Sequence, residues 1–132
     1  MTIRQLLPIL CLVLLLSGCI PNEFRVENGT EENSSTAEQV IKDESRVKGA
    51  AVLFHEDHLL VGIRVKTFSR FNKRKIASAI EKELQEKYPE LSVFVSADSK
   101  ILTETTKLIL NKEQIDVLEE IHELIALAEE QT

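Results

Sequence analysis

The sequence is poor in residues on which several protein classes depend. It has two Cys, no Trp, four Gly and three Pro in 132 residues, and 5% of its residues are aromatic. Two Cys are too few for a disulfide-stapled secreted domain, and the few Gly form no glycine-rich phosphate loop. The net charge of −6 argues against a bulk nucleic-acid binder. One domain's length argues against a large multidomain enzyme, whereas 43% hydrophobic residues can build a core.

The longest apolar run lies near the N-terminus and is short for a membrane span. It covers the eleven residues 6–16 and follows Arg4, whereas a span needs about 20 residues. This pattern is typical of an export signal. The next residues, Leu16–Cys19, read Leu-Ser-Gly-Cys and are similar to a bacterial lipobox, in which the Cys receives a diacylglyceryl group. We predict a signal peptide over 1–18 and a lipid anchor at Cys19; the alternative is a plain signal anchor with an incidental Cys.

The next segment, residues 19–46, has a different composition. It is rich in Asn, Ser, Thr and Glu, and its apolar residues show no period. These features predict a lipidated Cys19 followed by a flexible acidic tether, with a root-mean-square reach of roughly 30 Å. One weak helical stretch is expected over Ala37–Glu44. Hydrophobic periodicity begins at Val47, so the folded domain is predicted over 47–132.

A β-hairpin opens the predicted domain. Two β-branched, apolar stretches, Val47–Phe54 and Leu59–Lys66, flank the polar residues His55–His58. A register with His55 opposite His58 collects apolar residues on one face. Its pairs are Phe54 with Leu59, Val52 with Val61, Ala50 with Ile63 and Lys48 with Val65. Because Glu-Asp is not a preferred two-residue turn, we expect a four-residue loop.

The remaining pattern predicts a helix, a strand and two more helices. A helix is expected over Asn72–Lys87 and a strand over Leu91–Ala97, with Asp98 capping the next helix. Asn111 and Gln114 match a capping box that would open the last helix. The order β-β-α-β-α-α predicts an α+β fold with a small three-stranded sheet. The third strand lies either beside the second, after a right-handed crossover, or beside the first in a fully antiparallel sheet. We favour the fully antiparallel sheet.

Three motifs carry a resemblance to a known family. These are Val61–Val65 (Val-Gly-Ile-Arg-Val), Arg74–Ala77 (Arg-Lys-Ile-Ala) and Val93–Asp98 (Val-Phe-Val-Ser-Ala-Asp). Together with the lipobox, they resemble the YhcN/YlaJ family of sporulation lipoproteins of spore-forming bacteria, over about residues 47–110. The resemblance implies a lipoprotein on the membrane of the developing spore, with a part in spore assembly or germination. It implies no catalytic residue.

Candidate catalytic and metal-binding residues are few. His55 and His58 could hold a divalent ion across the end of the hairpin, although an exposed polar turn explains them more simply. Ser96 and Asp98 are explained by a strand end and a helix cap, and His122 by the edge of an apolar stripe. There is no nucleophile elbow and the mature chain has no free thiol. We therefore predict a protein that is not an enzyme and that uses no metal or other cofactor.

Two sets of residues are candidates for interaction. The second face of the hairpin carries Leu53 and Leu60 and would be joined by Phe94, and either a partner or the last helix must cover it. A basic cluster lies within residues 61–75, which contain no acidic residue. Its members are Arg64, Lys66, Arg70, Lys73, Arg74 and Lys75. The cluster is either a solvated loop or a surface for anionic headgroups, a wall polymer or an acidic partner.

These features predict a membrane-anchored binding or structural module. Its partners would be the membrane, through Cys19, and an envelope protein, with no role in nucleic-acid binding. A module that binds an anionic small molecule or a wall polymer is the first alternative. A small hydrolase of unrecognised type is the second.

Overall fold

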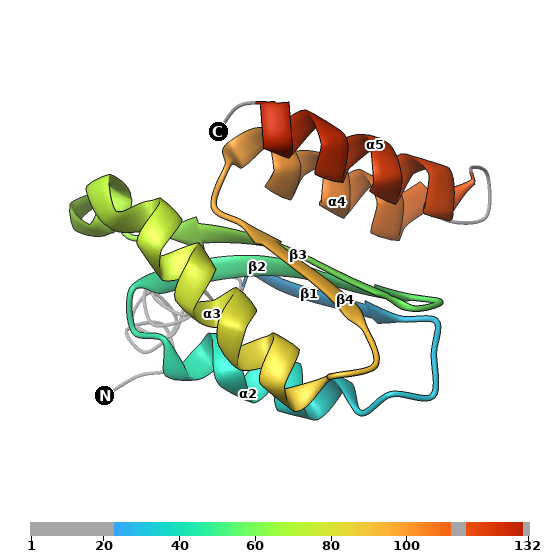
Figure 1. Ribbon diagram of the computed structural model, residues 1–132. Coiled ribbons are helices and arrows are strands. Elements are labelled where there is room, and N and C mark those ends of the chain that lie inside the picture. The colour runs from blue at the N-terminus through green and yellow to red at the C-terminus, as the bar shows by residue number, and fades with distance from the viewer. Residues whose placement is uncertain (1–22, 112–115, 131–132) are drawn as a thin grey trace, which may run out of the picture.

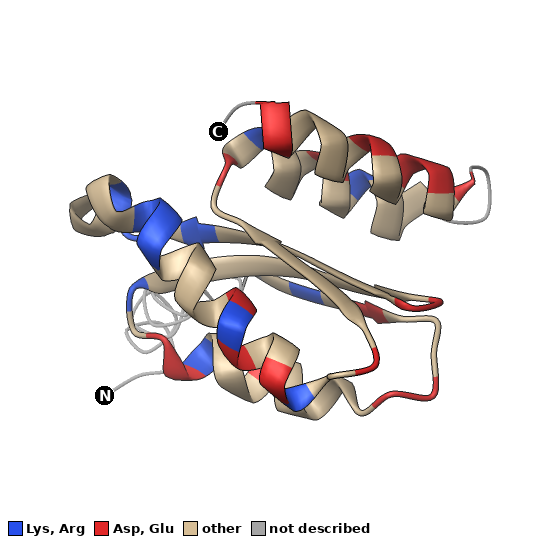
Figure 2. Ribbon diagram, in the orientation of Figure 1, with Lys and Arg blue, Asp and Glu red and all other residues tan. Residues whose placement is uncertain are grey.

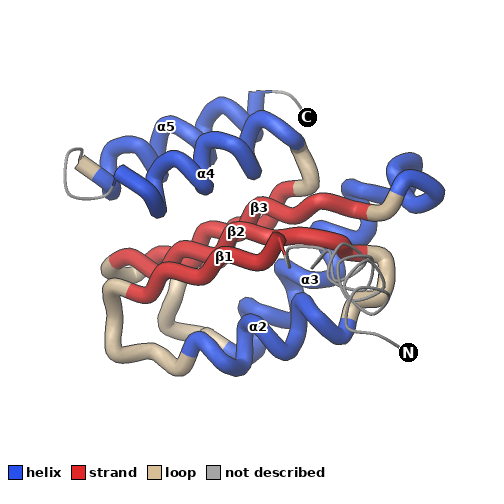
Figure 3. The backbone as a smooth tube through the Cα atoms, turned by 180° about the vertical axis from the view of Figure 1, so that it is seen from behind, coloured by secondary structure: helices blue, strands red, loops and turns tan. Residues whose placement is uncertain are grey.

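A computed structural model describes residues 23–111 and 116–130, which form three layers (Figure 1). The central sheet contains β1 (Glu23–Asn28), β2 (Val47–His55), β3 (His58–Val65) and β4 (Ser92–Ser96). Helices α2 (Ser34–Asp43) and α3 (Lys73–Lys87) cover one face. Helices α4 (Ser99–Asn111) and α5 (Val117–Glu130) cover the other face, as the view from behind also shows (Figure 3). A short 3₁₀ helix, η1 (Thr67–Asn72), connects β3 to α3. The fold is therefore α+β.

The central hairpin has the predicted register over most of its length. His55 lies opposite His58, and the pairs Phe54–Leu59, Val52–Val61 and Ala50–Ile63 follow. The predicted Lys48–Val65 pair is wrong, because an irregularity between Val47 and Gly49 pairs Val47 with Val65. Val47 is thereby buried while Lys48 is exposed. The predicted four-residue loop is also wrong, because Glu56 and Asp57 alone form the turn, and Glu56 adopts a φ of 52°.

The sheet has four strands rather than the predicted three. The additional strand is β1, which pairs in parallel with β2. It and α2 lie in the segment that the sequence pattern assigned to a flexible tether. Three apolar residues of α2, namely Ala37, Val40 and Ile41, are buried in the core, so residues 23–43 contribute an ordered strand and helix to the domain.

The fourth strand lies at the edge that the sequence analysis did not favour. β4 pairs in parallel with β3, in the strand order β1-β2-β3-β4. The fully antiparallel arrangement is therefore wrong, and the β3–α3–β4 crossover is right-handed, as expected for parallel neighbours (Figure 1). Because α2 lies on the same sheet face as α3 while β1 and β2 run opposite to β3 and β4, the β1–α2–β2 connection has the opposite hand.

Side chains fix helix α2 at both ends, through a buried tyrosine at its start and a local ion pair at its end. At its start, the buried Tyr88 hydroxyl accepts a hydrogen bond from the Ala37 N–H at 3.0 Å and donates one to the Asn33 carbonyl. Burial raises the pKa of this hydroxyl. At its end, the Glu44 carboxylate accepts hydrogen bonds from Arg46 Nε at 2.7 Å and Nη2 at 2.9 Å. These bonds to Arg46 lower the pKa of Glu44 to about 2. Side chains thus fix a helix that the sequence predicted only as a weak stretch over Ala37–Glu44.

The second sheet face is covered from within the chain. Leu53 and Leu60 are 2% and 0% exposed and pack in a cluster with residues of α4 and α5. Helix α4 approaches so closely that a Cβ atom on Gly62 would lie 2.7 Å from the Leu102 Cα. A side chain at position 62 would therefore force the helix away from the sheet.

The later elements agree with their predicted bounds except at the start of the last helix. Helix α3 buries the predicted stripe, and Asp98 Oδ1 caps α4 by accepting a hydrogen bond from the Lys100 N–H at 2.8 Å. Asn111 ends α4, while Gln114 lies outside the described residues. Asp116 caps α5 instead, because its Oδ1 accepts a hydrogen bond from the Glu119 N–H at 3.2 Å.

Candidate functional site

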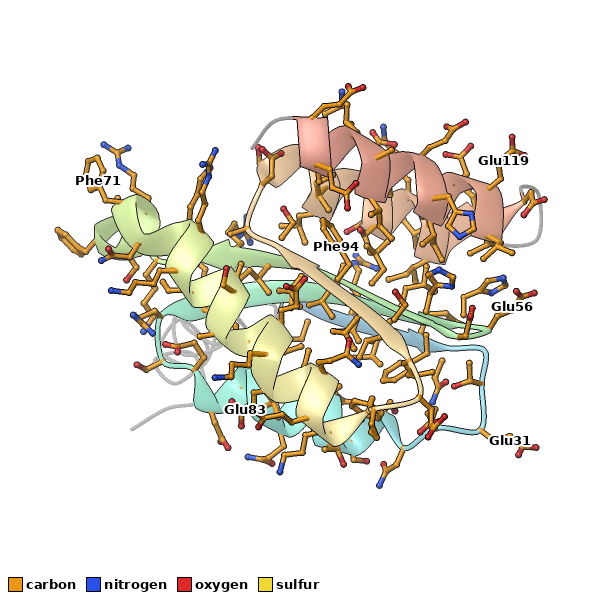
Figure 4. The ribbon with its side chains drawn as sticks, viewed as in Figure 1. Glu31, Glu56, Phe71, Glu83, Phe94 and Glu119 are labelled. Carbon is orange, nitrogen blue, oxygen red and sulfur yellow. The ribbon has the colours of Figure 1, made fainter. Side chains whose placement is uncertain are left out.

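The helix η1 presents two phenylalanines to solvent. Phe68 is 98% exposed and Phe71 is 88% exposed, and η1 has no buried residue. Figure 4 shows Phe71 pointing away from the body of the molecule. Side chains this exposed do not contribute to the hydrophobic core, and exposing two large apolar side chains to water costs free energy. Their exposure points to a use outside the domain.

Basic side chains surround these phenylalanines. We call residues 66–75 the aromatic–basic tip; its exposed cations are Lys66, Arg70, Lys73, Arg74 and Lys75. The Arg70 guanidinium carbon lies 5.2 Å from the centroid of the Phe71 ring. The first turn of α3 contains no acidic residue, and the Asn72 side chain makes no capping hydrogen bond. Cations at a helix start oppose the helix dipole by about 0.3–1 kcal/mol each, so this helix start is poorly arranged for stability.

The aromatic–basic tip lies at the end of the sheet where the described chain begins. Glu23, the first residue of β1, pairs with Gly49, which in turn pairs with Arg64 near the end of β3. Two strand spacings, about 10 Å, therefore separate the start of β1 from the end of β3, which leads into η1. Figure 2 shows Lys and Arg residues concentrated on η1 and the start of α3, whereas α5 carries acidic residues.

A groove of about 360 Å³ adjoins the aromatic–basic tip. It lies between the first half of α3, β4 and the end of α5, and Lys73, Phe94 and Asp98 are among its lining residues. Two of its three carboxylates bond to the backbone: Asp98 caps α4, and Glu81 Oε1 accepts a hydrogen bond from the Val95 N–H at 3.0 Å. The Ser96 hydroxyl accepts a hydrogen bond from the Asp98 N–H at 3.1 Å. These contacts agree with the structural explanation of Ser96 and Asp98.

The structure separates the predicted interaction residues into two groups. Leu53 and Leu60 are buried under α4 and cannot meet a partner in the folded chain. Phe94 is half-buried and lines the groove. Arg64, at the end of β3, is exposed, as are the five cations of the tip. The tip phenylalanines were not predicted, although aromatic residues interleaved with basic ones at 66–75 are visible in the sequence.

The predicted histidine pair is joined by a third histidine. His58 lies opposite His55 in the hairpin, and its ring packs edge-on against that of His122, with 5.0 Å between the ring centroids. Within residues 23–111 and 116–130, no group of three or more His, Cys, Asp or Glu side chains is arranged to hold a metal ion.

The predicted signal peptide and Cys19 lie outside the described residues. In the part of the chain that the structure describes, no helix is both long and apolar enough to cross a membrane.

Comparison with models of protein families, with curated proteins and with solved structures finds no match to this chain.

Proposed function

We propose that this chain is a lipid-anchored, non-enzymatic module that docks on the anionic surface of its own membrane through the aromatic–basic tip. The observation that carries the proposal is the pair of exposed phenylalanines, Phe68 and Phe71, among five cations. Apolar rings can enter the boundary between headgroups and acyl chains, while Lys and Arg bind anionic headgroups.

The position of the predicted lipid anchor supports this orientation. Cys19 lies four residues before Glu23, and four residues span at most about 14 Å. Two acyl chains on Cys19 would hold it stably at the bilayer surface. The start of β1 would then lie within that distance of the membrane, with the aromatic–basic tip at the same end of the sheet. This short connection replaces the reach of roughly 30 Å expected of a tether.

The phenylalanines favour a bilayer over other anionic partners. A wall polymer or a soluble anionic ligand would attract the cations but offers no apolar interior for exposed rings. An acidic protein with an apolar surface remains the competing occupant of the aromatic–basic tip. Protein-free vesicles distinguish the two, because they would not bind the chain if its partner were an acidic protein.

The resemblance to sporulation lipoproteins supports a location on the spore membrane. With the domain docked end-on, the end of α4, the start of α5 and the hairpin turn lie on the side away from the bilayer (Figure 1). This arrangement leaves them accessible to an envelope protein partner, so the chain would act in spore envelope assembly or germination.

The groove beside the aromatic–basic tip favours a second candidate function, the binding of a small anionic ligand. Lys73 and Arg74 line it, but so do Glu81, Asp98 and Glu129. This mixed lining is a weaker match to an anion than the tip is to a membrane. A hydrolase is the least supported alternative, since Ser96 and Asp98 bond to the backbone around the start of α4.

The phenylalanines provide the test of this proposal. Changing Phe68→Ser and Phe71→Ser together should weaken binding of residues 20–132 to phosphatidylglycerol-containing vesicles by roughly 30- to 150-fold. Burying a Phe is worth about 1.5–3 kcal/mol in full, and partial insertion of two rings gives about 2–3 kcal/mol. Vesicle sedimentation measures the change. Circular dichroism should show an unchanged fold, because η1 buries no residue.

Leu110→Ser is the matched control for this substitution. Leu110 is also a large exposed hydrophobic residue, 63% exposed in the last turn of α4. Helix α4 ends at the hairpin end of the molecule, away from the aromatic–basic tip (Figure 1). Its substitution should leave vesicle binding unchanged. Equal binding by wild type and the double variant would refute membrane insertion of the tip.

A further inference from the structure

Two histidines meet where the hairpin touches the last helix. The Nε2 atoms of His58 and His122 lie 3.3 Å apart. His58 extends from the first residue of β3, and its side chain is only 14% exposed, whereas His122 is exposed on α5. Residues 64 positions apart in the chain thus point the same ring nitrogen at one another.

This separation matches the spacing of two ligands on one metal ion. Zinc binds imidazole nitrogen at about 2.0–2.1 Å in tetrahedral geometry, which places two ligand nitrogens about 3.3–3.4 Å apart. The same distance allows a hydrogen bond between the two rings in the metal-free protein. The pair therefore requires little movement to accept an ion.

The other ring nitrogen of His58, Nδ1, is buried beside a carboxylate. Its Nδ1 is buried and lies 2.8 Å from Asp57 Oδ1, although the two atoms are not aligned as a hydrogen bond. A carboxylate beside the non-ligating nitrogen is the usual neighbour of a metal-bound histidine, since it fixes the tautomer that leaves Nε2 available. Asp57 lies close enough for this role, and a rotation that aligns its carboxylate with Nδ1 would complete the hydrogen bond.

The surroundings favour a cation. Acidic residues are concentrated on the hairpin turn and the first turns of α5 (Figure 2). These residues are Glu56, Asp57, Asp116, Glu119, Glu120 and Glu123. Glu56 and Glu119 point outward from the molecule (Figure 4). The described part of the chain provides only two aligned ligands here, which leaves two tetrahedral positions open to water.

We propose that His58 and His122 bind a divalent transition-metal ion such as Zn²⁺, which clamps α5 to the β2–β3 hairpin. Imidazole suits Zn²⁺, Cu²⁺ and Ni²⁺, whereas Mg²⁺ and Ca²⁺ prefer oxygen ligands. With two protein ligands, the site binds more weakly than a structural site with four. The inference is independent of membrane docking, because the histidines lie at the opposite end of the sheet from the aromatic–basic tip.

Calorimetric titration of the full chain in detergent with ZnCl₂ tests this proposal. Wild type is expected to bind one ion per chain, and His58→Gln or His122→Gln should weaken binding at least about tenfold. His55→Gln is the matched control and should leave the affinity for Zn²⁺ unchanged. Titration with MgCl₂ in place of ZnCl₂ should show no binding. The double His58→Gln/His122→Gln variant measures how much Zn²⁺ the thiols bind without the two histidines.

A second measurement separates clamping from simple binding. Zn²⁺ should raise the melting temperature of wild type, because it binds the folded state, and should slow amide exchange in α5. Neither change should occur in the double variant. Absence of Zn²⁺ binding by wild type, equal binding by the double variant, or loss of binding with His55→Gln would overturn the proposed ligand pair. Unchanged exchange in α5 with bound Zn²⁺ would overturn the clamp.

Discussion

Replacing Lys66, Arg70, Lys73 and Lys75 together by Gln is expected to weaken binding of residues 20–132 to anionic vesicles by between a hundredfold and a thousandfold at low salt. Each Lys or Arg near an anionic surface contributes about 1 kcal/mol, and about 1.4 kcal/mol corresponds to tenfold in affinity. Wild-type binding should also fall as salt is raised, because the Debye length shortens. Arg74 is retained, so that one of the two cations that line the groove, Lys73 and Arg74, stays in place.

A second set of four lysines provides the control. Lys82, Lys87, Lys100 and Lys107 are exposed outside the aromatic–basic tip, so their replacement by Gln changes the net charge equally. This variant should bind nearly as well as wild type. If both variants lose affinity to the same extent, net charge rather than the tip controls binding, and the docking surface has been misplaced.

The second large effect concerns the covered face of the sheet. Leu60→Glu is expected to unfold the domain or to cost more than about 4 kcal/mol, since it places a carboxylate at a site that is 0% exposed. No basic residue belongs to the apolar cluster around it, whose members come from β2, β3, α4 and α5. Urea unfolding followed by circular dichroism measures the loss.

Leu110→Glu is the matched control for this prediction. It makes the same chemical change at a position that is 63% exposed, where surface substitutions usually change stability by less than about 0.5 kcal/mol. A folded Leu60→Glu protein with near wild-type stability would mean that α4 and α5 do not cover this face in solution. The interaction-surface interpretation of Leu53 and Leu60 would then return.

The hairpin was predictable because its two faces differ in composition. Pairing Phe54 with Leu59 also pairs Val52 with Val61 and Ala50 with Ile63 on one apolar face, and a shift by one residue destroys that face. The irregularity at Lys48 was not predictable from the alternation, because it depends on placing Val47 in the core. The parallel position of β4 was equally hidden, since the same sequence permits pairing with either edge of the hairpin.

The first strand was missed, and α2 was expected only as a weak helical stretch over Ala37–Glu44, because the polar residues around them have structural uses. Asn28 Oδ1 accepts hydrogen bonds from the Thr30 N–H and hydroxyl, and Asn33 Oδ1 accepts one from the Ser35 N–H. These are turn and cap contacts, which have the same composition as a flexible segment. The apolar residues of the region are few, and the β1–α2–β2 connection has the uncommon hand.

The candidate site was predicted in its charge but not in its aromatic part. Basic residues at 64–75 are evident in the sequence, whereas the exposure of Phe68 and Phe71 depends on η1 standing clear of the core. Likewise, His58 was a candidate ligand, but its partner His122 is 64 residues away. That pairing depends on α5 folding back over the hairpin end, which the periodicity of α5 alone does not specify.

Tryptophan fluorescence tests membrane docking most directly, because the chain has no Trp of its own. Phe71→Trp and Leu110→Trp each introduce one fluorophore, the first in the aromatic–basic tip and the second at the hairpin end. With anionic vesicles containing brominated lipids, docking predicts a blue-shifted and quenched emission from position 71 and an unchanged emission from position 110. Bound protein with unshifted, unquenched emission from position 71 would contradict the account.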